Sequence, residues 1–253
     1  MQAEGEIPSV LCYNGRIGGR TCMCMYTYKN CPFKGVCARQ KHKPCDGACN
    51  IITEFSYLVE ESNIPQKYKK PKELFPEEDD LESFYTLSDI KKDILAFTEE
   101  GRQLYLYGNT GCAKTSWACK MALTYMAMIA SGNGFNNKKC FFLFVPTFLA
   151  QQKDFSNDNR KELLDKAMNS SLVIIDDIGA VMNSNYDISV LTNVIDCRTS
   201  NGYATIYTSN LSLSELAKAV GVRIADRISS DIVIKLVGNS RRNYTNTYRR
   251  KGE

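Results

Sequence analysis

The feature that most constrains the fold is a glycine-containing turn between a short apolar run and a long, mostly apolar segment. Residues 103–107 have the length and composition of a buried strand, and residues 114–130 have the composition of a helix. The turn begins at Gly108 and leads into Lys114 and Thr115. This layout is typical of a phosphate-binding loop, because backbone N–H groups and the helix N-terminus hold phosphate oxygens there.

The turn predicts a set of nucleotide contacts in which the lysine reaches the β- and γ-phosphates and the threonine hydroxyl ligates Mg²⁺. These residues are Gly108, Asn109, Thr110, Gly111, Cys112, Ala113, Lys114, Thr115 and Ser116. The pattern G-x-x-x-x-G-K-[ST] has glycine where this chain has Ala113. If that position needs a positive φ, alanine costs about 1–2 kcal/mol. We therefore expect reduced nucleotide affinity or turnover.

Length and composition set the broad class. With 253 residues and 43% hydrophobic content, the chain suffices for one α/β core and a small accessory module. We find no apolar run long enough to span a membrane and no signal-peptide pattern, so we expect a cytoplasmic protein without disulfides. The net charge of +4 does not indicate a polycation, although Arg249, Arg250 and Lys251 make residues 243–253 a basic tail.

Cysteine is concentrated near the start of the chain. Seven of the 11 cysteines, and the single histidine, lie between residues 12 and 49. Thiolates and imidazole at short spacing suit Zn²⁺, and such a short segment needs a metal in order to fold. One interpretation uses Cys22, Cys31, Cys37 and His42; another uses Cys24, Cys31 and Cys37 with Cys45 or Cys49. We predict structural zinc in residues 1–60, with an iron–sulfur cluster or unliganded cysteines as alternatives.

A proline-containing stretch separates this module from the phosphate loop. Its prolines are Pro65, Pro71 and Pro76, each of which discourages helix immediately before it. We therefore assign residues 61–82 to a linker, preceded by a short helix over residues 51–61. Residues 83–100 carry apolar side chains at helical spacing, which predicts one helix capped by Ser88 or Asp89.

Four further apolar runs predict strands, and the first of them has the continuous apolar character of a parallel strand buried on both faces. They are residues 140–145, which end before Pro146, and residues 172–175, 204–208 and 232–237. Polar side chains follow two of them, Asp176 and Asp177 after the second and Asn210 after the third. We expect Asp176 to support Mg²⁺, Asp177 to polarise the attacking water, and Asn210 to position that water or to sense phosphate.

The segments between these strands predict helices. Residues 147–168 indicate helical pieces broken around residues 154–158, and residues 188–198 and 212–220 indicate two more helices. Arg223 and Arg227 are four residues apart, so they share one helical face. Both are candidates to reach a phosphate in the same chain or in a neighbouring subunit.

Because these motifs follow one another in this order along the chain, residues 63–242 resemble the DnaC/DnaI-type helicase loaders of the AAA+ superfamily. Asn-Ile-Pro-Gln-Lys-Tyr from residue 63 resembles their linker signature, and residues 172–179 resemble their Walker B strand. Residues 208–211 resemble their sensor 1 segment, and residues 223–228 resemble their arginine-finger helix. Residues 238–242 resemble the segment that ends in their sensor 2 arginine.

The resemblance implies an AAA+ phosphate-loop domain over residues 83–242, with a central parallel sheet flanked by helices. It implies that Asn210 is sensor 1, that Arg227 is the arginine finger acting on a neighbouring subunit with Arg223 as second choice, and that Arg242 is sensor 2. The implied function is ATP-dependent loading of a DnaB-type replicative helicase onto single-stranded DNA by a self-associating protein.

By the same resemblance, residues 1–60 grip the helicase and residues 147–168 face single-stranded DNA. Two alternatives remain open at this point. One is an IstB-like transposition helper ATPase, which shares the core and differs in partner. The other is a zinc-dependent nucleic-acid-binding adaptor that does not hydrolyse ATP.

Overall fold

The computed structural model describes residues 50–69, 74–76, 78–132, 139–180 and 184–238. Within them the chain forms a five-stranded sheet of order β2-β3-β4-β1-β5, in which every pair is parallel. The strands are β1 (Gln103–Gly108), β2 (Cys140–Phe144), β3 (Leu172–Asp176), β4 (Ala204–Ser209) and β5 (Ile232–Leu236). The predicted α/β fold with a central parallel sheet is therefore confirmed.

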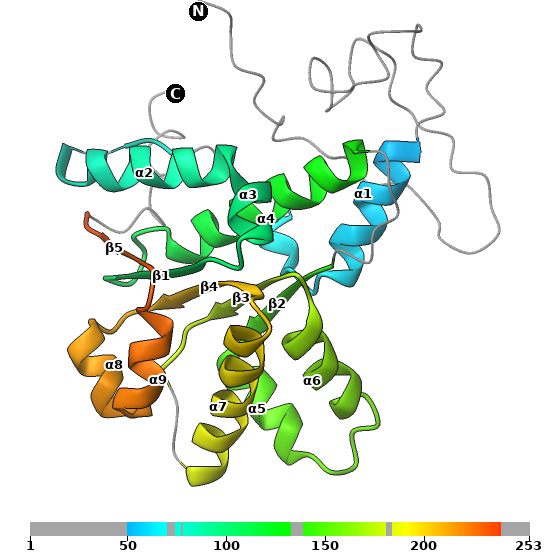
Figure 1. The fold of residues 1–253 in the computed structure, drawn as a ribbon, viewed down its shortest axis with the longest axis vertical. Coiled ribbons are helices and arrows are strands. Elements are labelled where there is room, and N and C mark those ends of the chain that lie inside the picture. Colours follow the sequence, from blue (N-terminus) through cyan, green and yellow to red (C-terminus); the bar gives the residue numbers. More distant parts are fainter. Residues whose placement is uncertain (1–49, 70–73, 77, 133–138, 181–183, 239–253) are drawn as a thin grey trace, which may run out of the picture.

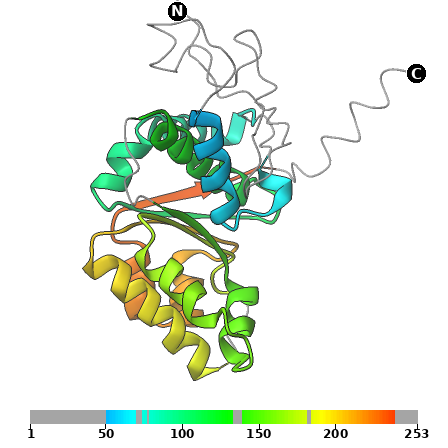
Figure 2. The ribbon, with the colours of Figure 1, turned by 90° about the vertical axis from the view of Figure 1, so that its right-hand side faces the viewer.

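Helices cover both faces of the sheet (Figures 1 and 2). On one face lie α1 (Asn50–Glu61), α2 (Leu81–Lys92), α3 (Ile94–Glu99) and α4 (Lys114–Ser131). On the other lie α5 (Val145–Lys153), α6 (Arg160–Asn169), α7 (Asn185–Ser200), α8 (Leu213–Val220) and α9 (Val222–Ile228). Two short 3-10 turns, η2 (Gln66–Tyr68) and η3 (Glu78–Asp80), precede α2.

The two layers exist because successive strand residues point to opposite faces. In β1, Leu104 and Leu106 belong to the apolar cluster formed with α1 to α4, whereas Tyr105 belongs to the cluster under α5 to α9. In β3, Ile174 and Ile175 divide in the same way. Both faces of β1, β3 and β4 are buried, which explains why these strands read as continuous apolar runs, whereas the edge strand β5 alternates between exposed and buried residues.

The single helix predicted within residues 83–100, beginning after Ser88 or Asp89, is wrong in its start and its extent. The segment forms two helices, α2 and α3, separated at Asp93, whose φ of −100° and ψ of 26° interrupt the first. Ser88 and Asp89 lie inside α2 and cap neither helix. The true start at Leu81 was not evident because the first turns of α2 expose Leu81 and Tyr85, so they lack an apolar stripe.

The break predicted around residues 154–158 is confirmed. The Asp154 carboxylate accepts hydrogen bonds from the N–H and the hydroxyl of Ser156, a turn that ends α5 before α6 begins. The strand expected to stop at Pro146 ends at Phe144. Pro146 occupies the first turn of α5, where its missing N–H costs no hydrogen bond.

Residues 62 and 63 cover the free edge of β2. The Phe142 N–H donates to the Ser62 carbonyl at 2.7 Å, and the Asn63 amide donates to the Phe142 carbonyl at 3.0 Å. Helix α1 precedes this contact and packs Ile51, Phe55 and Val59 into the α4 side of the core. The boundaries of the predicted cysteine-rich module (1–60), linker (61–82), ATPase domain (83–242) and basic tail (243–253) stay predictions. Residues 1–49 and 243–253 lie outside the described residues.

Candidate nucleotide site at the carboxyl edge of the sheet

Strands β3, β4 and β1 are neighbours, so their carboxyl ends meet at one edge of the sheet. Ligands of open α/β sheets bind at this edge. Here β3 ends in Asp176, β4 ends in Ser209, and β1 ends in Gly108, from which the phosphate loop leads to α4. The topology thus gathers most of the predicted site residues from segments about a hundred residues apart.

The loop backbone depends on unusual dihedral angles. Gly108 has a φ of 146°, and a Cβ there would lie 2.1 Å from the Leu236 carbonyl oxygen, so only glycine fits. Gly111 also has a positive φ, of 95°. Ala113 has a φ of 73° and a ψ of 17°, in the left-handed region. The free-energy cost that we expected for alanine in a left-handed conformation therefore applies here, at about 1–2 kcal/mol.

Lys114 is the first residue of α4, and its side chain turns back over the loop. Its ammonium donates to the carbonyls of Gly108 and Asn109, both at 2.8 Å, and to the amide oxygen of Asn210 at 2.9 Å. The Cys112 sulfur lies 3.6 Å from it. The lysine is buried, with 8% of its surface exposed, so three oxygen acceptors hold its charge in place.

Thr115 and Asp176 form the second contact between loop and sheet. The Thr115 hydroxyl donates to Asp176 Oδ1 at 2.7 Å, and the Thr208 hydroxyl donates to the same oxygen at 2.6 Å. Burial raises the pKa of Asp176; the hydrogen bonds from Thr208 and Thr115 oppose that rise, and the neighbouring Asp177 adds to it. A hydroxyl and a carboxylate this close supply the hard oxygen ligands that Mg²⁺ requires.

Asp177 follows in a constrained conformation, with a φ of 62°. Its N–H donates to the Thr208 hydroxyl at 3.1 Å, and its carboxylate accepts from the Asn210 amide at 3.4 Å. The next peptide is also tied to β4, because the Ile178 N–H donates to the Thr208 carbonyl at 2.9 Å. The left-handed turn thereby directs Asp177 toward Asn210.

Two residues of the cluster lie in the predicted sensor 1 segment, residues 208–211, but the sequence assigned them no role of their own. The Thr208 hydroxyl donates to the Asp176 carboxylate and accepts from the Asp177 N–H, and the Ser209 hydroxyl donates to the Ile178 carbonyl at 2.6 Å. Both are buried at the end of β4, beside the predicted Asn210. The sequence signal that could have identified them is the pair of polar side chains at the end of the otherwise mostly apolar strand β4.

The predicted arginines lie elsewhere. Arg223 donates to Asp196 Oδ2 at 3.0 Å, and Arg227 donates to Asp196 Oδ1, so both helix α9 arginines pair with helix α7. Helix α9 ends shortly before β5 begins, so Arg227 lies toward the amino edge of the sheet. The structure therefore does not bring either arginine to Lys114 of the same chain, and Arg242 lies outside the described residues.

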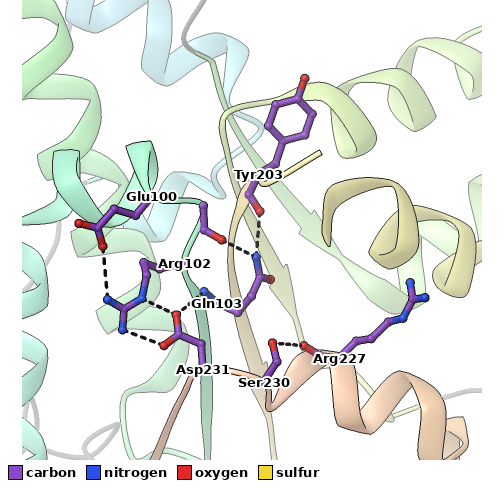
Figure 3. A network of polar contacts seen from close by, with 8 residues as sticks. Glu100, Arg102, Gln103, Tyr203, Arg227, Ser230 and Asp231 are labelled. Carbon is purple, nitrogen blue, oxygen red and sulfur yellow. Dashed lines mark hydrogen bonds and ion pairs between the residues drawn. The ribbon is translucent and has the colours of Figure 1, made fainter. Parts of the chain in front are cut away.

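A separate polar network joins the amino ends of the strands (Figure 3). Arg102 donates to Asp231 at 2.7 Å and the Gln103 N–H donates to the same carboxylate at 3.2 Å, while the Gln103 amide donates to the Tyr203 carbonyl at 2.9 Å. The Arg227 carbonyl accepts from the Ser230 hydroxyl at 2.9 Å, and its guanidinium points away from the network. The turn between α9 and β5 is thereby fixed.

The predicted zinc ligands, Cys22 to Cys49 and His42, lie outside the described residues. In the part of the chain that the structure describes, no group of three or more His, Cys, Asp or Glu side chains is arranged to hold a metal ion. The described cysteines are unpaired thiols: Cys112, Cys119, Cys140 and Cys197. Among the described helices, none has the length and apolarity needed to cross a membrane.

The sheet order and the loop with its flanking acids define a phosphate-loop protein of the AAA+ class. The chain belongs to the family of IstB-like ATP binding proteins, whose profile matches residues 85–247, more than half of its length. This agrees with the resemblance drawn from the motifs.

Curated relatives are helicase loaders. The chain is 28% identical over 94 residues to the replicative helicase loader DnaC of Escherichia coli strain K12, covering 36% of this chain and 38% of DnaC. It is 31% identical over 121 residues to the replicative helicase loader DnaI of Bacillus subtilis strain 168, covering 47% of this chain and 36% of DnaI. The matches thus span well under half of each relative.

Solved structures share the fold. The DnaC helicase loader matches with a TM-score of 0.57 and 19% identity, covering 68% of this chain and 100% of that chain. The DnaA replication initiator bound to AMPPCP and single-stranded DNA matches with a TM-score of 0.55 and 13% identity, covering 75% of this chain and 56% of that chain.

Proposed function

We propose that this protein is an ATP-dependent loader of a replicative DNA helicase. The observation that carries the proposal is the convergence of Lys114, Thr115, Asp176 and Asn210 at one edge of the sheet. The family description and the names of the curated relatives support it.

For ATP binding, the loop N–H groups and the α4 N-terminus supply donors to the phosphates. The Lys114 ammonium exchanges its carbonyl partners for phosphate oxygens, and the Thr115 hydroxyl and the Asp176 carboxylate are placed to hold Mg²⁺. Bound Mg²⁺ supplies charge neutralisation at the phosphate oxygens. The left-handed Ala113 opposes tight closure of the loop, which favours weak binding or slow turnover.

For hydrolysis, Asp177 polarises the attacking water while Asn210 holds its position beside the γ-phosphate. The two side chains already contact each other, and Asn210 also contacts Lys114. Arg227 of an adjacent subunit completes the site, because it is directed away from the loop of its own chain. Self-association is therefore part of the proposal, and Arg242 remains a candidate sensor 2.

For DNA, the proposed contact is the α5–α6 segment. Phe155 is 76% exposed at its tip, and the Arg160 guanidinium lies 4.5 Å from the centre of its ring. An exposed aromatic ring beside a cation suits stacking of unpaired bases next to a phosphate backbone. The initiator DnaA, which shares the fold, is described as bound to single-stranded DNA.

For the helicase, the proposed contact is the cysteine-rich module of residues 1–60, with zinc as its structural metal.

The test of the proposed function is a loading assay with the replicative helicase of the source cell on circular single-stranded DNA. We expect ATP-dependent transfer of helicase by the wild-type protein and none by Lys114→Ala. Lys120→Ala, later in the same helix, is the matched control and should load normally. A wild-type protein that neither binds nor transfers the helicase contradicts the proposal.

Membership of the IstB-like family keeps one second candidate from the sequence analysis, the IstB-like transposition helper ATPase with the same nucleotide site. The two differ in partner. Affinity isolation from cells distinguishes them, since a transposase on the purified protein supports the helper and a replicative helicase supports the loader.

A further inference from the structure

Asp196 is a carboxylate that the proposed chemistry does not use, yet it holds both candidate finger arginines. It lies on α7, accepts from Arg223 through Oδ2 and from Arg227 through Oδ1, and is 27% exposed. The Arg227 side chain is 28% exposed, whereas that of Arg223 is 71% exposed. Arg227 is thus the better fixed of the two guanidinium groups.

The geometry leaves donors of Arg227 available. A guanidinium has five N–H donors in a planar fork, and Asp196 takes the Nη1 side of this one. A planar group held along one side presents its other donors in a fixed direction. Two phosphate oxygens of a neighbouring subunit are a fitting partner for them.

The helix that carries the arginine is fixed at its end as well. After α9 the chain turns through Ser230, whose hydroxyl donates to the Arg227 carbonyl at 2.9 Å, into Asp231, which Arg102 holds. Side chain and backbone of Arg227 are therefore both restrained. Restraint matters because misplacement of a group by about 1 Å can cost 10²-fold in rate.

We infer that Asp196 is a positioning residue for Arg227, orienting its guanidinium toward the nucleotide of the adjacent subunit. Arg223 shares the carboxylate, whose negative charge offsets the repulsion between the two guanidinium groups. The inference rests on the proposed function, because it requires hydrolysis at an interface between copies.

The test mixes two variants that are each inactive. Arg227→Ala keeps a nucleotide site and lacks the finger, and Lys114→Ala keeps the finger and lacks the nucleotide site. We expect the mixture to recover ATPase activity at interfaces where a Lys114→Ala subunit donates Arg227. Asp196→Asn is then added to the Lys114→Ala subunit alone, which is the donor of Arg227. The kcat of the mixture should fall about tenfold, with the KM for ATP unchanged.

When Asp196→Asn is placed instead in the Arg227→Ala subunit, which binds the nucleotide, that subunit has no Arg227 to orient. We therefore expect kcat to fall only when Asp196→Asn is in the Lys114→Ala subunit, which donates Arg227. A role in folding alone would lower the melting temperature and affect both placements equally. Asp89→Asn, which removes an exposed partner of Lys92 on α2, is the control donor and should keep full activity.

The outcomes distinguish two claims, hydrolysis across a subunit interface and the positioning of Arg227 by Asp196. If the simple mixture shows no recovered activity, hydrolysis across an interface is wrong and the role of Asp196 falls with it. If the mixture is active and Asp196→Asn in the donor changes nothing, or acts equally from either subunit, the proposed function stands and the positioning role is overturned.

Discussion

The Lys114 ammonium donates a 2.9 Å hydrogen bond to the Asn210 amide oxygen, which joins the phosphate loop to the end of β4 across 96 residues of sequence. The same amide donates to Asp177 at 3.4 Å. Asn210 therefore contacts both the proposed phosphate-binding lysine and the proposed water-polarising acid, which supports the proposal that it senses the γ-phosphate.

Asn210→Ala should separate hydrolysis from binding. Lys114 keeps its two carbonyl partners, so ATP affinity should change by less than about threefold, while loss of a preorganised donor should lower kcat about 10²-fold. Steady-state ATPase assays with calorimetric binding check this. Asn201→Ala, at the end of α7, removes another exposed asparagine and should leave both quantities unchanged. A mutant with normal kcat would remove Asn210 from the site.

Thr115→Ala should abolish the effect of Mg²⁺ on ATP binding, because the hydroxyl beside Asp176 is lost. Thr115→Ser retains the hydroxyl and should bind like wild type. Titration calorimetry with Mg²⁺ and with EDTA measures the difference. Thr124→Ala removes a hydroxyl of the same helix that donates to the Lys120 carbonyl, and serves as control. Equal Mg²⁺ dependence in Thr115→Ala and wild type would refute the assignment.

Ala113→Gly should stabilise the protein by about 1 kcal/mol, since the left-handed conformation penalises a Cβ by about 1–2 kcal/mol and glycine gives part of this back as chain entropy. Urea unfolding gives the free energy directly. Ala217→Gly lies within the helix α8 and should instead destabilise by about 1 kcal/mol. We also expect tighter ATP binding by Ala113→Gly; destabilisation of this variant would show that the loop is not strained.

Asp231→Asn should lower the free energy of unfolding at pH 7 by about 1 kcal/mol, as expected for a partly exposed ion pair. The hydrogen bond from Arg102 lowers the pKa of Asp231 below its ordinary 3.8. The folded state therefore favours the charged form, so this contribution is present above pH 3.8 and is lost as the pH falls through the folded-state pKa.

Unfolding at a series of pH values should thus show wild type and Asp231→Asn converging in acid. Asp89→Asn, which removes an exposed partner of Lys92, is the control and should follow wild type throughout. A stability difference that stays constant from pH 7 to pH 3 would mean that the network in Figure 3 acts through shape and not through charge.

Much of this architecture was predictable because its signals are local. Continuous apolar runs identified the five strands, and the glycines with Lys114 and Thr115 identified the loop. The departure at Ala113 was also informative, since the structure gives that residue the positive φ that the pattern required.

Other features depend on contacts that local periodicity does not encode. Thr208 gained its role only when β4 came to lie beside β3. Arg198, expected simply to end a helix, is fully buried and donates to the Ala204 carbonyl and to the Ser170 carbonyl just after α6. Burial lowers its pKa to about 10. The pairing of Asp196 with α9 likewise arises from tertiary packing.

The measurement that tests the central claim most directly is calorimetric titration of the full chain with Mg²⁺·ATP, beside Lys114→Ala and the matched Lys120→Ala. The account predicts one saturable site per chain in wild type and Lys120→Ala, and a loss of affinity of about 10²-fold or more in Lys114→Ala. Equal affinity of Lys114→Ala and wild type for Mg²⁺·ATP would contradict it.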